Sequence, residues 1–142
     1  MTATPFRWRH RVTYAECTVG NHVYYARYLD ILETARGEFF RALGAPLASL
    51  QEADMIFPVV ECRLAYRAPA RYDDELDVEV WVAALSRVRV TFGYRVWRGA
   101  GELLVEGSTN HVCTGRDEKP KRMTPELCAL LRPHLAAGAA AA

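Results

Sequence analysis

The segment from Glu16 to Arg36 holds the residues of this sequence that best suit chemistry at a carbonyl group. It contains a hydroxyl at Thr18, an amide at Asn21, an imidazole at His22 and a carboxylate at Glu33. Hydrolysis at a carbonyl needs a donor for the oxygen as it gains negative charge, and a group that orients or deprotonates water. These four side chains are candidates for the second task.

A helix predicted over residues 25–43 supplies donors for the carbonyl oxygen. Apolar side chains recur there at helical spacing, and Gly44 and Pro46 end the pattern. The first amides of a helix have no intrahelical acceptor and lie at the positive end of its dipole, so a carbonyl placed near Tyr25 and Ala26 is polarised. The alternative is an ordinary capped helix start, which offers the same amides.

Glu33 is the strongest carboxylate, because it lies eight residues after Tyr25 on the same helix. We expect burial near a dimer interface to raise its pKa toward a useful range. The alternative is an i,i+3 pair with Arg36 that only stabilises the helix. His22 is the one candidate whose ordinary pKa, about 6.5, lies near neutrality. Asn21 follows a glycine and is alternatively a turn residue.

The rest of the chain predicts a sheet that positions this segment. Residues 5–14 alternate in the period of a half-buried strand, and strand-like segments follow at 56–66, 75–85, 87–97 and 103–114. Short turns between consecutive strands imply an antiparallel sheet. A short helix is expected within 124–135, starting at Thr124. The fold class is α+β: a five-stranded antiparallel sheet wrapped around one long helix, which is the hot-dog fold, plus a short C-terminal helix.

Length and composition exclude several classes of function. The 142 residues predict a single domain over 1–135 and an Ala-rich tail over 136–142. No apolar run approaches the roughly 20 residues that cross a bilayer, and no secretory signal is evident, so we expect a cytoplasmic protein without a membrane partner. The four cysteines lack metal-ligand or disulfide spacing, and a net charge of +1 makes nucleic acid an improbable partner.

The loop and helix resemble the 4-hydroxybenzoyl-CoA thioesterase family. The family pattern Tyr-x-Asp-x-Asp-x-x-Gly-x-Val, followed by Tyr-Leu and Glu-x-Ala-Arg, is similar to YAECTVGNHVYYARYL at 14–29 and ETAR at 33–36. The turn LAYRAPARYDDEL at 64–76 looks like the family's Tyr-x-x-Pro turn between strands. The resemblance implies a homodimer or dimer of dimers that hydrolyses an acyl-CoA, needs no cofactor because coenzyme A is part of the substrate, and uses the Tyr25 amide to activate the carbonyl.

One departure concerns the catalytic acid of that family, which falls on Thr18, while the preceding acid falls on Glu16. A neutral hydroxyl cannot act as the base that a carboxylate supplies. The loop is also similar to that of enediyne-pathway thioesterases, which lack this acid too, and Glu33 resembles in its spacing the acid of another hot-dog branch. We expect Glu16 to brace the loop. Two alternatives remain: a non-catalytic acyl-binding scaffold, and a thioesterase for carrier-protein-bound acyl groups.

Coenzyme A carries phosphates, which call for arginine and lysine at the mouth of a site. Two basic clusters are candidates, Arg87 with Arg89 after Ser86, and Lys119, Lys121 and Arg122 before the last helix. Each is alternatively a solvated face. Four aromatic residues are candidates to line an acyl pocket, with plain core packing as the alternative: Tyr24, Tyr25, Tyr28 and Trp81.

Overall fold

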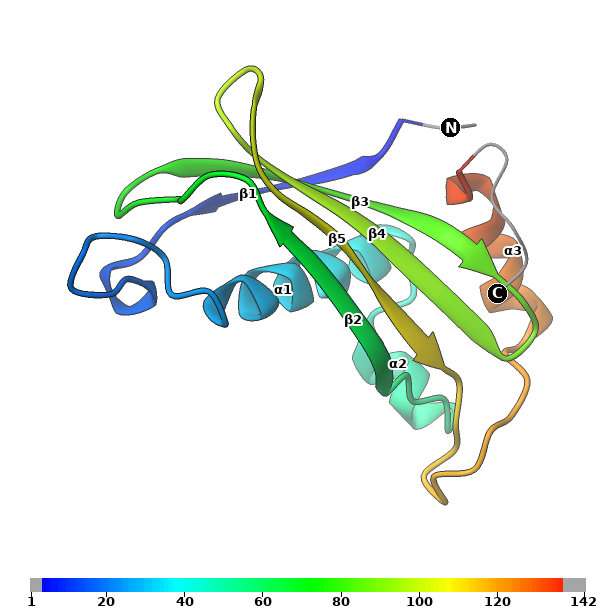
Figure 1. Cartoon of the computed structure of the whole chain (residues 1–142). Helices are drawn as coiled ribbons and strands as arrows, with labels where there is room; N and C mark the ends of the chain where they lie inside the picture. The colour runs from blue at the N-terminus through cyan, green and yellow to red at the C-terminus, as the bar shows by residue number, and fades with distance from the viewer. Residues whose placement is uncertain (1–3, 137–142) are drawn as a thin grey trace.

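The computed structural model describes residues 4–136, which form one curved sheet over a long helix (Figure 1). The strands are β1 Phe6–Arg11, β2 Val59–Tyr66, β3 Glu75–Leu85, β4 Arg89–Arg98 and β5 Glu102–Val112; the helices are α1 Arg27–Ala42, α2 Leu47–Glu52 and α3 Pro125–Leu131. Short 3-10 turns lie at Tyr14–Glu16 and Arg132–His134. The predicted hot-dog fold is confirmed. Of the predicted tail, residues 137–142 lie outside the described residues. Between residues 4 and 136, no helix is long and apolar enough to cross a membrane.

The order of strands across the sheet is β1-β3-β4-β5-β2, and every neighbouring pair is antiparallel. The antiparallel sheet was predicted, but the order of the strands across the sheet differs from their order along the chain. Residues 67–74 carry the chain across the sheet, so β2 pairs with β5 while β3 pairs with β1. Strand β2 therefore lies at an edge of the sheet.

The helix α1 packs its apolar face on the inner face of the sheet. Phe39 is fully buried and meets Phe92 of β4 edge to face, with ring centroids 6.0 Å apart. Burial of one such side chain contributes roughly 1.5–3 kcal/mol. The short helix α2 was not predicted, because six residues with Leu50 as the one buried side chain show no helical period.

A chain of buried hydrogen bonds connects α1 to the sheet. Arg36 Nη1 donates to the Tyr94 hydroxyl over 3.0 Å, and this hydroxyl lies 2.7 Å from Thr109 Oγ1. Thr109 Oγ1 lies 2.8 Å from His111 Nε2, and His111 Nδ1 lies 2.9 Å from the carbonyl oxygen of Phe57. Since that carbonyl can only accept, Nδ1 carries the proton and Nε2 accepts from Thr109. Every bond in the chain is then satisfied with a neutral imidazole.

This network predicts a stability that depends on pH. Burial lowers the pKa of His111 from 6.5 to about 4. The unfolded chain takes up a proton below pH ~6.5 and the folded chain only near pH 4, so the stability should decrease through this window, by on the order of 3 kcal/mol. Urea unfolding between pH 7 and 4.5 measures the decrease. His111→Gln should be less stable at pH 7 and show a shallower pH dependence. Equal slopes for both proteins would contradict the assignment.

Candidate active site at the start of the long helix

The loop of residues 17–26 folds into a tight turn that leads to α1. The Thr18 amide donates to the carbonyl of His22 over 2.7 Å, and the Asn21 amide donates to the carbonyl of Thr18 over 3.0 Å. Asn21 has a φ of 59°, a conformation that asparagine tolerates better than most residues. Its side-chain oxygen accepts the Tyr72 amide over 3.1 Å. The loop is thereby tied to the segment just before β3.

Glu16 braces the start of this loop, in the role expected from the sequence. Its carboxylate accepts the Thr13 amide over 2.7 Å and lies 2.9 Å from His10 Nε2. The predicted first strand ends earlier than expected, at Arg11, because the chain turns into the 3-10 segment that holds Glu16. The sequence did not predict this contact of His10, because its partner Glu16 lies beyond the end of the strand.

The start of α1 presents two amides that point to a carbonyl-binding site. The helix begins at Arg27 with Ala26 as its N-cap. In the part of the chain that the structure describes, the N–H groups of Tyr25 and Ala26 have no acceptor, whereas the N–H of Tyr24 donates to the carbonyl of Glu16. Free amides at the positive end of a 16-residue helix suit an oxygen that gains negative charge.

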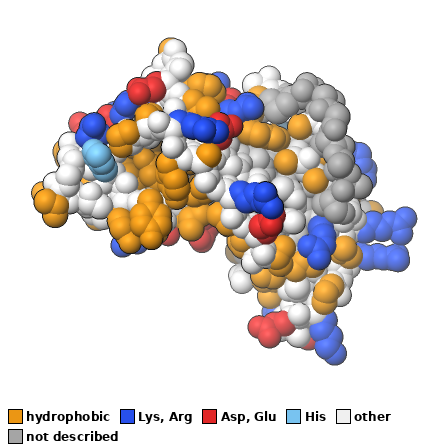
Figure 2. All heavy atoms as spheres, in the orientation of Figure 1, with side chains coloured by type: hydrophobic (Ala, Val, Ile, Leu, Met, Phe, Trp, Pro, Cys, Tyr) orange, Lys and Arg blue, Asp and Glu red, His pale blue; other side chains and the backbone are white. Residues whose placement is uncertain are grey.

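A cavity of about 350 Å³ lies beside these amides, lined among others by His22, Tyr25, Tyr28 and Tyr66. The Tyr66 hydroxyl donates to the carbonyl of Tyr25 over 3.0 Å, and the Tyr28 hydroxyl accepts the Ala70 amide over 3.0 Å. Burial raises the pKa of both tyrosines, so neither is a base at neutral pH. Figure 2 shows hydrophobic side chains gathered on this part of the surface. The site therefore combines amide donors with an aromatic wall.

The predicted catalytic residues divide into three groups: cavity residues, turn residues and Glu33. His22 and Tyr25 line the cavity, while Thr18 and Asn21 hold the turn, Thr18 Oγ1 donating to the carbonyl of His22 over 3.3 Å. The side chain of Glu33 is exposed and, among residues 4–136, forms no hydrogen bond or ion pair. Eight residues correspond to about 12 Å of helix, so Glu33 and Tyr25 of one chain cannot contact the same carbonyl group.

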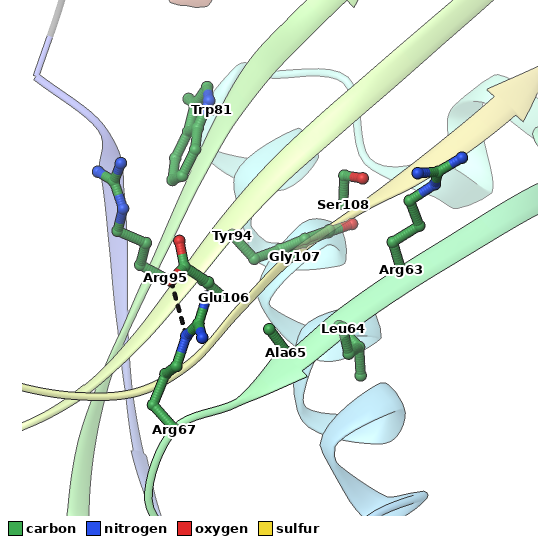
Figure 3. A pocket seen from close by; sticks show the side chains of 10 residues that line it. All are labelled: Arg63, Leu64, Ala65, Arg67, Trp81, Tyr94, Arg95, Glu106, Gly107 and Ser108. Atoms are coloured by element: carbon green, nitrogen blue, oxygen red, sulfur yellow. Dashed lines mark hydrogen bonds and ion pairs between the residues drawn. The ribbon is translucent and has the colours of Figure 1, made fainter.

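Of the four candidate pocket aromatics, Tyr25 and Tyr28 line the cavity. Tyr24 does not line it and packs against the ring of Tyr25, and Trp81 lies on the opposite face of the sheet. Figure 3 shows Trp81 in a shallow hollow on the outer face, with Arg95 nearby. The indole lies against Gly93, where a Cβ would come within 2.4 Å of the ring. Successive side chains of a strand point to opposite faces of the sheet. Val80 and Val82, on either side of Trp81, are buried on the inner face, so Trp81 lies on the outer face.

A second cavity, of about 460 Å³, lies at the other end of the sheet between the β3–β4 turn and α3. Its lining includes Arg87 and Arg122, one from each predicted basic cluster, and Arg132, which was not predicted from the sequence. None of the three forms an ion pair within the described residues, and Figure 2 shows Lys and Arg side chains on this side. Arg89 and Lys121 do not line the cavity; Lys121 Nζ instead donates to the carbonyl of Asp54 over 3.0 Å.

The start of α1 and the helix α3, which contribute to these two cavities, lie at opposite ends of the molecule (Figure 1). The loop is fixed to the segment before β3, and Arg87 follows the last residue of β3 by two. A strand of 11 residues spans about 35 Å. This span is longer than the reach of a coenzyme A thioester from its carbonyl to its diphosphate. The two cavities of one chain are therefore too far apart to bind the two ends of one such molecule.

A curved antiparallel sheet over one helix, with free helix-start amides beside an aromatic cavity, defines a hot-dog thioesterase. The chain belongs to the thioesterase superfamily, whose family model matches residues 20–105. The acyl-CoA thioester hydrolase YbgC of Escherichia coli O6:H1 is 31% identical over 125 residues, 88% of this chain and 90% of that protein.

Solved structures agree with this assignment. A hypothetical protein from Thermus thermophilus is 35% identical with a TM-score of 0.85, covering 90% of this chain and 98% of its own. A probable thioesterase from Bartonella henselae is 25% identical with a TM-score of 0.81, covering 85% of this chain and 100% of its own. The fold and the enzyme class predicted from the sequence, an acyl-CoA thioester hydrolase, are confirmed.

Proposed function

We propose that the protein hydrolyses acyl-CoA thioesters at a site shared by two copies of the chain, in the cytoplasm and without a separate cofactor. The observation that carries this proposal is the pair of unbonded amides at Tyr25 and Ala26 beside the aromatic cavity. The name of the Escherichia coli relative supports coenzyme A rather than a carrier protein as the thiol.

The chemistry follows from this geometry. The thioester oxygen binds at the Tyr25 amide, water attacks the carbonyl carbon, and the electron pair of the C=O bond moves to the oxygen. The amides and the helix dipole stabilise this oxyanion. Its collapse breaks the C–S bond and releases the free acid and the thiolate, which takes up the proton removed from the water. Glu33 of the second copy, or His22, accepts the proton of the attacking water.

The edge strand β2 supports a dimer. Val59, Val60 and Tyr66 are each about half exposed along this edge. Unpaired edges with apolar side chains invite a second strand. Two copies paired antiparallel along β2 place the Val59 end of one strand beside the Tyr66 end of the other. The second cavity, lined by Arg87, Arg122 and Arg132, is the arginine cavity. In this pair, the arginine cavity of one copy lies at the same end as the loop of residues 17–26 of the other copy.

Hydrolysis of a panel of short, long and aromatic acyl-CoA substrates, followed by release of the thiol, tests the function. We expect hydrolysis of at least one substrate, and slower hydrolysis of the same acyl group on a carrier protein. Folded protein that is silent across the panel would favour the acyl-binding scaffold.

The arginine cavity predicts a split between KM and kcat. Arg87→Ala and Arg122→Ala should each raise KM for acyl-CoA by about tenfold, the loss of one charge-assisted hydrogen bond, with little change in kcat. Steady-state kinetics measure both constants. The control is Arg41→Ala, since Arg41 lies at the end of α1 and pairs with Glu38 instead. An unchanged KM in both cavity variants would remove the phosphate assignment.

A further inference from the structure

A third cavity, of about 310 Å³, lies between α1, α2 and the residues that precede β2. Its walls are mainly apolar: Phe40, Leu47, Met55, Ile56, Phe57 and Phe92. Two polar side chains, Arg36 and Gln51, also line it. A largely apolar cavity with a few polar groups is typical of a binding site for a small organic group.

Arg36 is the unusual member of this lining. Its guanidinium is partly buried, and one N–H donates to the Tyr94 hydroxyl over 3.0 Å. Across residues 4–136, no carboxylate pairs with Arg36, and no acceptor is found for its other N–H groups. The preceding acid on the same helix, Glu33, is exposed and does not contact it. Among the described residues no fully buried side-chain nitrogen lacks a partner, so these unpaired N–H groups of Arg36 are open to solvent and accessible to an incoming anion.

The network behind Arg36 orients it for such a ligand. Tyr94 is held by Thr109, and Thr109 is held by His111, whose Nδ1 donates to a backbone carbonyl. The hydrogen bond to Tyr94 uses one N–H group of the guanidinium and leaves its other N–H groups for another acceptor. A carboxylate matches this geometry, because its two oxygens can accept a pair of parallel N–H groups.

We propose that this cavity receives the far end of the acyl group and that Arg36 binds a carboxylate there, so the enzyme prefers acyl thioesters of dicarboxylic acids. The inference rests on the proposed function. In a pair joined along β2, Phe57 lies just before the Val59 end of one strand, beside the Tyr66 end of the other. The acyl group thus extends from the helix start of one copy into the cavity of its partner.

Binding of small probes tests the carboxylate site without requiring catalysis. Calorimetric titration should show that hexanoate binds the wild-type protein and binds Arg36→Met 10- to 100-fold more weakly. Hexan-1-ol has the same chain without the charge, and its affinity should differ far less between the two proteins. No binding of hexanoate to the wild type, or equal binding to both proteins, overturns the inference.

Two further variants keep the test decisive if Arg36→Met fails to fold. Arg36→Lys retains the charge without the planar pair of donors and should bind hexanoate with intermediate affinity. Tyr94→Phe retains the guanidinium but removes its positioning hydroxyl, and should also weaken hexanoate. Full hexanoate affinity in both variants overturns the inference.

Kinetics separate this inference from the proposed function. The ratio of kcat/KM for adipoyl-CoA to that for hexanoyl-CoA should be about 10 in the wild type and should fall at least tenfold in Arg36→Met. Hydrolysis of hexanoyl-CoA without preference for adipoyl-CoA rejects the inference and leaves the function standing. Binding of hexanoate at Arg36 without hydrolysis of any acyl-CoA rejects the function alone.

Discussion

Glu33→Gln should lower kcat by about 10²–10⁴ while the fold remains intact, because the change keeps the shape of the side chain and removes a general base. Glu33 is exposed on α1, and among the described residues it is not used in any ion pair. The alternative partner, Arg36, is turned toward Tyr94 instead. A second copy that pairs along β2 would cover this carboxylate and bring it to the partner's helix start. Steady-state kinetics on protein with an unchanged circular dichroism spectrum measure the effect.

The control for this prediction is Thr18→Ala. Thr18 occupies the position of the family's catalytic acid, yet its hydroxyl donates only to the carbonyl of His22, so its loss should cost a modest factor. If Glu33→Gln retains near-full kcat, His22 becomes the base. The kcat of His22→Gln should then fall by about 10²–10⁴.

Val60→Lys should convert the protein to a monomer and lower kcat/KM at least 100-fold. Val60 is 50% exposed on the edge strand β2, and a charge on an edge strand opposes pairing. The loss is large because a single chain cannot join its amide site to its arginine cavity, about 35 Å away along β3. Light scattering and kinetics on the same sample measure both effects.

The matched control is Leu130→Lys, which places the same charge on an exposed apolar residue of α3. This variant should remain dimeric. A wild-type protein that is monomeric at micromolar concentration and fully active would contradict the shared site.

Most of the fold is evident from the sequence because its elements carry regular periods. Strand β3 has the predicted bounds, since the buried side chains of Val78, Val80 and Val82 recur at every second residue. The long helix starts two residues and ends one residue inside its predicted range. The order of strands was not predictable, because β2 and β3 are consecutive and separated by a short segment, yet pair with other strands.

The site was predictable where its residues are close in the sequence. The loop and the helix start adjoin one another, so His22 and Tyr25 could be grouped in advance. Tyr66 and Arg132 were missed because they reach their cavities through the tertiary fold. The chain of hydrogen bonds from Arg36 to His111 joins residues far apart in the sequence, and no local sequence pattern predicts it.

The placement of the loop and the arginine cavity at opposite ends of β3 has a genetic consequence. In a mixed pair, a chain with a damaged loop and a chain with a damaged arginine cavity combine so that both lesions fall in one site and neither falls in the other. With the proposed shared site, two alleles that are each inactive alone should therefore complement one another when expressed in the same cell. Two alleles that both damage the same end of the molecule should not complement. Co-expression of pairs of alleles therefore shows which end of the molecule each mutation damages.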